Sequence, residues 1–174
     1  MLFETGIEKG AQFSPCKKYR YALWRTWNQD DGHVMFIGLN PSTATETEDD
    51  PTVRRCMGFA KRWGFGGIYM MNLFAFRATD PKVMQAQAEP VGAENNSMIF
   101  MYAQSAQKVI CAWGAFECAV KRGREVEGLI TVGPAGVICR QKHLYCLGQT
   151  KDGHPRHPLY VPYSQKLERW EPKE

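Results

Sequence analysis

The sequence predicts an α/β fold, namely a three-layer α/β/α sandwich with a largely parallel central sheet and an N-terminal β-hairpin. Two observations predict it. Short apolar or alternating segments typical of strands recur along the chain, and segments with apolar residues at helical spacing lie between most of them. Strands that alternate with helices build a parallel sheet covered on both faces. The chain has no evident linker or repeat, so we expect a single α/β domain over residues 1–174.

The first half of the chain predicts a hairpin, a helix and a third strand. Alternation and aromatic enrichment over residues 17–27 predict a strand, NQDDG predicts a turn, and the apolar run over residues 33–39 predicts an antiparallel partner. Asp50 can cap a helix, and Pro51 suits its first position. Residues 67–76 are almost continuously apolar, as expected of a strand covered on both faces.

The second half continues the alternation. Its segments predict, in order, a short helix near residues 80–81, a helix over 92–107, a strand over 108–114, a helix over 115–130, a short strand over 143–148 and an irregular loop over 149–162.

The composition is typical of a soluble globular protein. Hydrophobic residues make up 44% and charged residues 23% of the chain, and the net charge of +4 permits a nucleic-acid partner without requiring one. No apolar run approaches the roughly 18 residues of a membrane span, and residues 1–10 lack the apolar segment of a secretory signal. We therefore expect a cytoplasmic protein with no membrane partner.

The cysteines do not form a recognisable metal motif. They lie at positions 16, 56, 111, 118, 139 and 146, with no C-x-x-C pair. Cys111 and Cys118 repeat the spacing of Cys139 and Cys146, which would suit four metal ligands. However, Cys111 and Cys139 lie in apolar runs, which favours small core residues in a reducing compartment. We expect neither a metal nor another cofactor.

Three polar residues lie where such a sheet would collect them. Asn40 follows an apolar strand, between Gly38, which allows close backbone approach, and Pro41, which disfavours helix at the residue before it. Asn72 lies inside an apolar strand, and His157 lies in the C-terminal loop. Ligands bind at the carboxyl ends of strands in open α/β sheets. Each residue also has a structural interpretation: a turn for Asn40, an amide bonded to backbone for Asn72, and a surface histidine for His157.

The spaced motifs resemble a known family. YRYALWRTW, GLNPSTA, RRCMGFAKRWGFGG, NLFAFRATDP, EPVG, AWG and LGQTKDGHPRHPLYV are similar to an uncharacterised bacterial and phage family, domain-of-unknown-function family 1643, over nearly the whole chain. Their order also resembles, more distantly, the uracil-DNA glycosylase superfamily. That superfamily has a three-layer α/β/α fold, a Gly-x-Asn/Asp-Pro motif, an asparagine in a later strand and a His-Pro loop. The usual His-Pro-Ser is His157-Pro158-Leu159 here.

The second resemblance implies a DNA N-glycosylase that hydrolyses the glycosidic bond of an unusual or modified pyrimidine, such as a modified phage base. The implied catalytic residues are Asn40, which would orient a water beneath the sugar C1′, and His157, which would donate to the base oxygen. Asn72, with Phe74 and Leu39, would bind a base turned out of its stack.

The same resemblance implies contacts to DNA near the site. Arg77, Lys151 and Arg156 would contact phosphates, and Leu159 or Tyr160 would fill the gap left by the base. Simple solubility is the alternative explanation for the three basic residues, since the chain is only mildly basic.

An acidic loop follows the first motif. One of its carboxylates could supply the charge that Asn40 lacks, but a solvated loop that ends in a helix cap is the interpretation favoured by the sequence. The residues concerned are Glu46, Glu48, Asp49 and Asp50. An acidic surface is unfavourable next to DNA. Two other functions therefore stay open: a hydrolase of a free nucleoside or nucleotide, and a non-catalytic module that binds a nucleobase or DNA.

Overall fold

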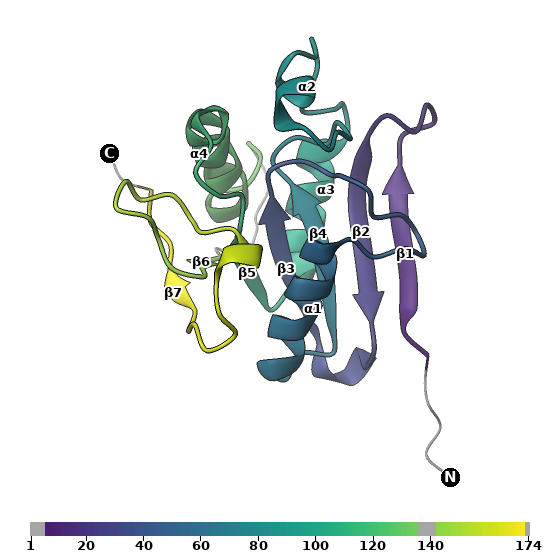
Figure 1. The fold of residues 1–174 in the computed structure, drawn as a ribbon, viewed down its shortest axis with the longest axis vertical. Helices are drawn as coiled ribbons and strands as arrows, with labels where there is room; N and C mark the ends of the chain where they lie inside the picture. Colours follow the sequence, from purple (N-terminus) through teal and green to yellow (C-terminus); the bar gives the residue numbers. More distant parts are fainter. Residues whose placement is uncertain (1–5, 136–141, 173–174) are drawn as a thin grey trace.

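The computed structural model describes residues 6–135 and 142–172, which form a mixed α/β fold (Figure 1). The described strands form a seven-stranded sheet in the order β1-β2-β4-β3-β5-β6-β7. The strands are β1 (Glu8–Phe13), β2 (Arg20–Thr26), β3 (His33–Gly38), β4 (Gly67–Asn72), β5 (Lys108–Cys111), β6 (Leu144–Cys146) and β7 (Glu168–Arg169). The helices are α1 (Pro51–Arg62), α2 (Pro81–Gln85), α3 (Asn95–Ser105) and α4 (Glu117–Thr131), with 3₁₀ turns η1 (Gln29–Asp31) and η2 (Pro158–Tyr160).

The centre of the sheet is parallel and its edges are antiparallel. β4, β3, β5 and β6 pair in parallel, whereas β1, β2 and β7 join their neighbours in antiparallel orientation. β3 is central because its residues are apolar on both faces: Val34 and Phe36 pack with one core cluster, and Met35 and Ile37 with the other. The expected mixed α/β architecture with a parallel centre is thus confirmed.

The predicted hairpin between residues 17–27 and 33–39 is wrong. β2 pairs with β1 and β4, and β4 separates it from β3. The NQDDG segment forms η1 instead of a hairpin turn. It crosses from β2 to β3 and leaves a gap of one strand between them, which β4 occupies. The N-terminal hairpin consists of β1 and β2, and β1 was not predicted because EKGAQF has little apolar alternation.

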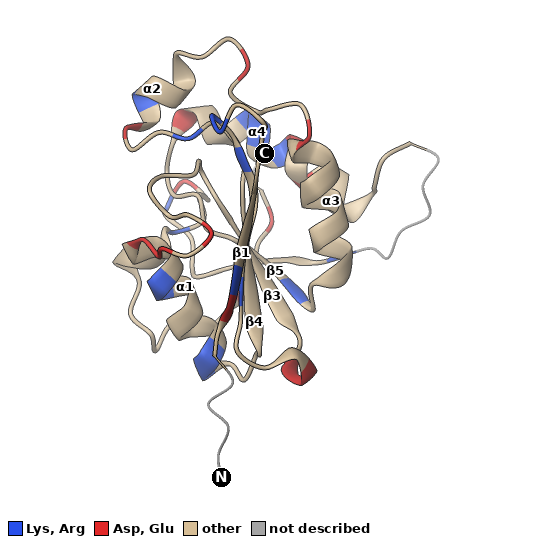
Figure 2. Cartoon of the chain, turned by 90° about the vertical axis from the view of Figure 1, so that its right-hand side faces the viewer, with Lys and Arg blue, Asp and Glu red and all other residues tan. Residues whose placement is uncertain are grey.

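Helices lie on both faces of the sheet. Viewed along the sheet edge, α1 lies on one side and α3 on the other (Figure 2). One core cluster joins α1 to the sheet through side chains such as Phe59 and Ala60. The second cluster joins α3 and α4 to the opposite face through residues such as Ile99 and Val126.

Helix α1 begins as its sequence predicts. The Asp50 carboxylate accepts a 2.8 Å hydrogen bond from the Val53 N–H, and Pro51 occupies the first helical turn. After the C-cap at Trp63, Gly64 adopts a φ of 80°, which is favourable for glycine and ends the helix. Residues 39–50 connect the end of β3 to the first turn of α1.

The cysteine interpretation holds for Cys111, which is fully buried in the core. Cys139 lies outside the described residues. Within residues 6–135 and 142–172, no three His, Cys, Asp or Glu side chains are grouped so as to hold a metal ion. None of the described helices combines the length and apolar character required to cross a membrane.

Candidate functional site

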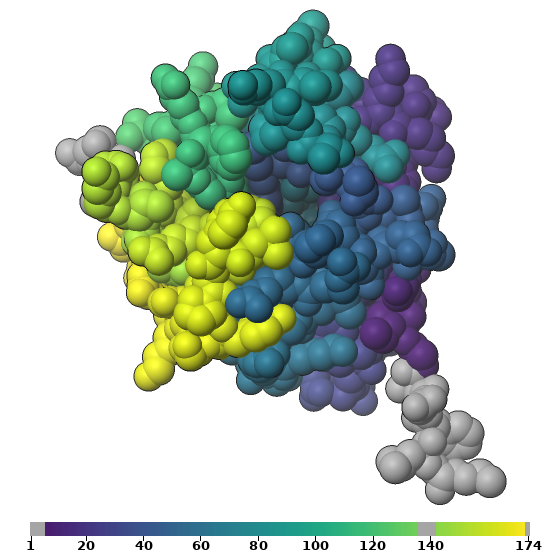
Figure 3. All heavy atoms as spheres, viewed as in Figure 1, coloured from purple at the N-terminus to yellow at the C-terminus, as the bar shows by residue number. Residues whose placement is uncertain are grey.

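A cavity of about 600 Å³ opens at the carboxyl ends of β3 and β4, a size typical of small-molecule pockets. In Figure 3 the surface is hollowed where blue, teal, green and yellow parts of the chain meet. The cavity is lined by residues of the β3–α1 segment, the end of β4, the segment before α2, the turn after β5 and the C-terminal loop.

Six of the sequence-predicted site residues line this one cavity. They are Leu39, Asn40, Asn72, Arg156, His157 and Tyr160. Asn40, Asn72 and His157 belong to three segments that are distant in sequence. The fold brings the first two together because Asn40 follows β3 and Asn72 ends the neighbouring parallel strand β4. The C-terminal loop supplies the third side chain.

The Asn40 amide is fixed by backbone carbonyls. Its Nδ2 donates to the Ala78 carbonyl at 2.7 Å and to the Pro41 carbonyl at 3.1 Å. These bonds tie the motif to the segment that precedes α2. Because the amide nitrogen is used in this way, Oδ1 is the atom with which Asn40 can accept a hydrogen bond from a ligand or a water. The structural interpretation and a binding role are therefore compatible.

The Asn72 amide is buried without a hydrogen bond to its nitrogen. The residue is 4% exposed, and Nδ2 has no partner among the described residues. A Cβ added at Gly38 would lie 2.9 Å from Asn72 Oδ1, so the glycine of the first motif makes room for this amide. An unpaired buried amide costs about 1–3 kcal/mol, and a ligand acceptor in the cavity would remove that cost.

Replacing Gly38 with alanine is expected to displace the Asn72 amide and to destabilise the fold by about 1–3 kcal/mol, the usual cost of overpacking. Gly128→Ala is the matched control, because nothing lies within 4 Å of a Cβ at this position in α4. Removing a helical glycine there should stabilise by about 0.5–1 kcal/mol. Chemical denaturation of both variants checks the prediction; equal effects would contradict it.

His157 presents a neutral ring with a defined tautomer. Its Nδ1 accepts a 3.3 Å hydrogen bond from the Leu159 N–H, which leaves the proton of the neutral ring on Nε2. Burial lowers the pKa of His157, and the negative charge of Asp50 opposes this shift only in part. At neutral pH the ring is therefore an uncharged N–H donor that lines the cavity.

An NMR titration of His157 is expected to give a midpoint below 6.5, because burial disfavours the charged ring. The unfolded chain then binds more protons than the folded protein. The His157 contribution to stability is thus fully retained above about pH 6.5 and is lost as the pH falls through the folded pKa. In Asp50→Asn the midpoint should fall further, since the opposing charge is gone. A midpoint at or above 6.5 would contradict the assignment.

Two charged residues complete the cavity. Asp50, weighed from sequence as a cap, also lines the cavity and influences the pKa of both His157 and Arg20. Arg20 was not predicted, although it lines the cavity and is 3% exposed. Its Nη1 donates to the Ala44 carbonyl at 3.0 Å. The available signal was an arginine within a strand segment, RYALWRT, that is otherwise rich in apolar and aromatic residues.

Buried side chains on the far side of β4 hold the segment that carries Asn72. Asn95 donates to the carbonyls of Asn72 and Leu73 at 3.0 and 3.1 Å, and Arg122 Nε donates to the Leu73 carbonyl at 3.0 Å. On the cavity side, the Arg55 guanidinium donates to the carbonyls of Pro158 and Val161. Arg55 thereby attaches the turn next to His157 to α1.

The acidic loop is anchored by a second buried arginine. Arg25 Nε pairs with Asp49 at 2.6 Å, and its Nη2 donates to the Thr45 and Glu48 carbonyls. Glu46 and Glu48 are exposed. The cap at Asp50 and the exposure of Glu46 and Glu48 agree with the interpretation favoured by the sequence, whereas Asp49, at 15% exposed, is the ion-pair partner of a buried arginine.

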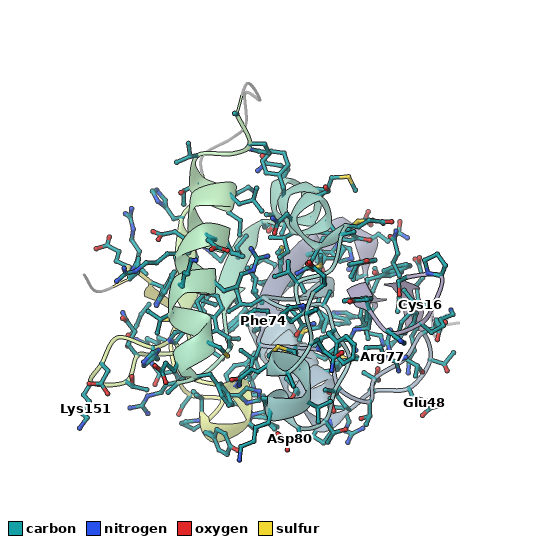
Figure 4. All side chains as sticks on the ribbon, turned by 90° about the horizontal axis from the view of Figure 1, so that it is seen from above. Cys16, Glu48, Phe74, Arg77, Asp80 and Lys151 are labelled. Atoms are coloured by element: carbon teal, nitrogen blue, oxygen red, sulfur yellow. The ribbon has the colours of Figure 1, made fainter. Side chains whose placement is uncertain are left out.

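The remaining predicted residues are not in the lining of the cavity. Phe74 is 8% exposed and belongs to the core cluster of α3 and α4. Arg77 donates to the Lys17 carbonyl and lies over the Phe13 ring. Figure 4 places Arg77 and Lys151 on opposite sides of the molecule, with Lys151 pointing outward. Leu159 is 42% exposed on η2.

Comparison with protein families identifies the family of this chain. A family model described as "Protein of unknown function (DUF1643)" matches residues 20–159. The chain belongs to this family. The DUF1643 match covers Arg20, Asn40, Asn72 and His157, so each of these cavity residues lies within the family domain. No curated protein and no solved structure matches the chain.

Proposed function

We propose that this protein is a DNA N-glycosylase that hydrolyses the glycosidic bond of an unusual or modified pyrimidine. One observation carries the proposal: Asn40, Asn72 and His157 line a single cavity large enough for a nucleoside. The order of strands and helices, with helices on both faces of a parallel centre, is in keeping with a uracil-DNA glycosylase-like sandwich.

The proposed binding of the base depends on Asn72. Its unpaired Nδ2 can donate to a carbonyl oxygen on the edge of a pyrimidine turned into the cavity. Cleavage of the glycosidic bond leaves negative charge on that base. His157 Nε2–H would donate to the base oxygen that receives this charge, and one such fixed donor is worth about 3–4 kcal/mol in a site that excludes water.

Positive charge develops on the sugar at the same time. Asn40 Oδ1 would accept a hydrogen bond from the attacking water and hold it beneath C1′, because Nδ2 is already bonded to backbone. Asparagine cannot take up the proton of that water at neutral pH. Asp50 is the carboxylate that lines the cavity among the described residues, and it would stabilise the sugar cation and accept the proton.

The mouth of the cavity has features that suit a duplex. Arg156 and Tyr160 line it and are exposed, the tyrosine at 82%. Arg156 would contact a phosphate next to the extruded nucleotide. Tyr160, with the neighbouring Leu159, would occupy the space that the base leaves, since exposed apolar side chains can replace lost stacking.

The proposal is tested with duplexes that carry uracil, mismatched pyrimidines or modified pyrimidines. Alkali then cleaves any abasic sites, and the products are separated by size. We expect cleavage of one modified substrate by the wild type and a loss of about 100-fold or more in His157→Ala. His154→Ala is the control, because that histidine lies in the same loop but outside the lining of this cavity. No cleavage across the panel would refute the proposal.

The acidic loop favours a second candidate, a hydrolase of free nucleosides or nucleotides. Glu46 and Glu48 are exposed on the segment that leads to the cavity, where they would repel a DNA backbone. A rise in melting temperature with nucleosides but not with oligonucleotides would support this candidate. Salt-dependent binding of DNA without any turnover would instead indicate a binding module.

A further inference from the structure

Two buried donors at the same cavity have no partner. Arg20 Nε and Asn72 Nδ2 lack a hydrogen-bond acceptor among the described residues, and both residues line the cavity. They are 3% and 4% exposed, so bulk solvent does not cover them. Buried polar groups are nearly always paired in folded proteins, and an exception needs a physical reason. Five buried side-chain atoms of the described residues lack a partner, and the two that belong to cavity-lining residues are the ones that a ligand in the cavity could satisfy.

The charge of Arg20 is not neutralised by a direct ion pair. Its Nη1 is bonded to the Ala44 carbonyl, a neutral acceptor, and the ion pairs of the described residues do not include it. Burying a guanidinium without a carboxylate is costly. A binding site can nevertheless contain such a buried cation. The free protein then bears the desolvation cost, and an anionic ligand offsets it by forming the ion pair.

Charges of both signs lie around Arg20. The pKa of Arg20 is lowered to about 10, mainly by burial and to a smaller extent by the charges of Arg77 and Arg25, while Asp50 opposes the shift. The guanidinium still carries its charge at neutral pH. Asp49 is already paired with Arg25, which leaves Asp50 as the nearby carboxylate that favours the charged form.

The first turn of α1 does not explain the unpaired donors. Asp50 accepts from the Val53 N–H and so places a negative charge at this helix terminus. An anion bound there would be repelled by it. Arg20 and Asn72 lie on the adjacent strands β2 and β4, and they form a separate pair of donors.

We infer that Arg20 and Asn72 bind an oxyanion of the substrate, either a carboxylate on the pyrimidine ring or the phosphate of a free nucleotide. The oxyanion site is inferred from the buried unpaired donors, whereas the identification of the ligand as a pyrimidine depends on the proposed function. A neutral base would satisfy the Asn72 amide but leave the guanidinium without a directly paired anion. An oxyanion has several lone pairs and satisfies both groups, and arginine suits its planar geometry.

Isothermal titration calorimetry at pH 7.5 with four ligands tests the inference. 5-Carboxyuracil against uracil measures the preference for a carboxylate, and uridine 5′-monophosphate against uridine measures the preference for a phosphate. We expect the wild type to bind one anion at least tenfold more tightly than its neutral counterpart, since charge-assisted hydrogen bonds are the stronger ones. The pair that shows the preference identifies the source of the oxyanion.

Variants assign the preference to the two donors. Arg20→Met and, independently, Asn72→Ala should each reduce the preference to less than threefold, with folding checked by circular dichroism. Asn72→Ala decides the matter if Arg20→Met does not fold. Lys82→Met is the control, because Lys82 is an exposed cation on α2 outside the lining of the cavity and should leave the ratio unchanged. Loss of the preference in Arg156→Met alone would place the anion at the mouth and overturn the inference.

Two results separate this inference from the proposed glycosylase activity. An anion preference that depends on Arg20, without cleavage of any duplex, would keep the oxyanion site and refute the proposed function. Conversely, the protein could release a base from a duplex yet bind neither anion better than its neutral counterpart. That result would support the proposed function and refute the oxyanion site. In that case Arg20 and Asn72 would be satisfied by water, and the inference is overturned.

Discussion

Asp50→Asn is expected to slow base release by about 100-fold or more while the fold is retained. Asparagine caps helices about as well as aspartate, so the bond to the Val53 N–H is preserved. The substitution removes only the negative charge at the cavity. In the proposed reaction that charge stabilises the sugar cation and accepts the water proton, and losing one such group typically costs a factor of 10² to 10³. Single-turnover rates on the preferred substrate measure the effect.

Asp80→Asn is the matched control for this prediction. Asp80 caps α2 by accepting from the Lys82 N–H at 2.9 Å, and its side chain is exposed and outside the cavity lining (Figure 4). The same chemical change at a helix cap should therefore leave the rate within about twofold and the melting temperature nearly unchanged. An Asp50→Asn protein with full activity would eliminate the carboxylate from the mechanism.

Arg25→Met is expected to destabilise the folded protein by about 3–5 kcal/mol, the largest stability effect that we predict. The Arg25 side chain is 0% exposed and pairs with Asp49 at 2.6 Å. It also donates to four backbone carbonyls, those of Gly10, Trp24, Thr45 and Glu48. Methionine leaves a partly buried carboxylate and several carbonyls without a partner. Urea denaturation monitored by circular dichroism measures the change.

Lys121→Met provides the comparison, since it also removes a cation but from an exposed position on α4, and it should change stability by less than about 0.5 kcal/mol. A similar loss in both variants would show that net charge, not the Arg25 contacts, is responsible.

Acid should weaken the same ion pair. Burial acts to raise the pKa of Asp49, but the hydrogen bond and charge of Arg25, together with Lys9, outweigh it, so the pKa lies below 3.8. The contribution of Asp49 to stability is therefore fully present above about pH 3.8 and is lost as the pH falls through the folded pKa. The stability difference between wild type and Asp49→Asn should shrink over that range in urea titrations. A difference that stays constant would contradict the pairing.

Local sequence signals predicted most elements but not their order in the sheet. The cap at Asp50, the glycine after α1 and the apolar run of β3 act within a few residues, and each was placed correctly. The pairing of β2 depends on β4, which lies some forty residues later in the chain. A polar five-residue turn is compatible with a hairpin and with a crossover, so residues 28–32 alone do not distinguish them.

Some residues of the candidate site were likewise predictable from the sequence, and others were not. Asn40 and Asn72 were found because they interrupt or end apolar strands, where an amide has few structural reasons to be. Arg20 was missed because an arginine at the start of an alternating strand normally faces solvent. The Ala75 carbonyl accepts from the Arg20 N–H at the start of β2, and the Ala44 carbonyl accepts from its guanidinium, so that both neighbouring segments enclose the side chain. Phe74 was assigned to the cavity, but it lies beyond the end of β4, where strand alternation no longer holds, and it packs in the core cluster of α3 and α4.

The cavity is lined both by Arg20 on β2 and by His157 beyond β6. These two residues are separated in sequence by almost the full length of the family domain. Contacts that close such long stretches of chain form slowly, because the entropy of a large loop is lost before the contacts can compensate. The pocket should accordingly be the last part of the molecule to mature during refolding. During refolding, the fluorescence change caused by ligand binding should therefore appear later than the recovery of helical ellipticity. Its appearance would show that the native state has formed.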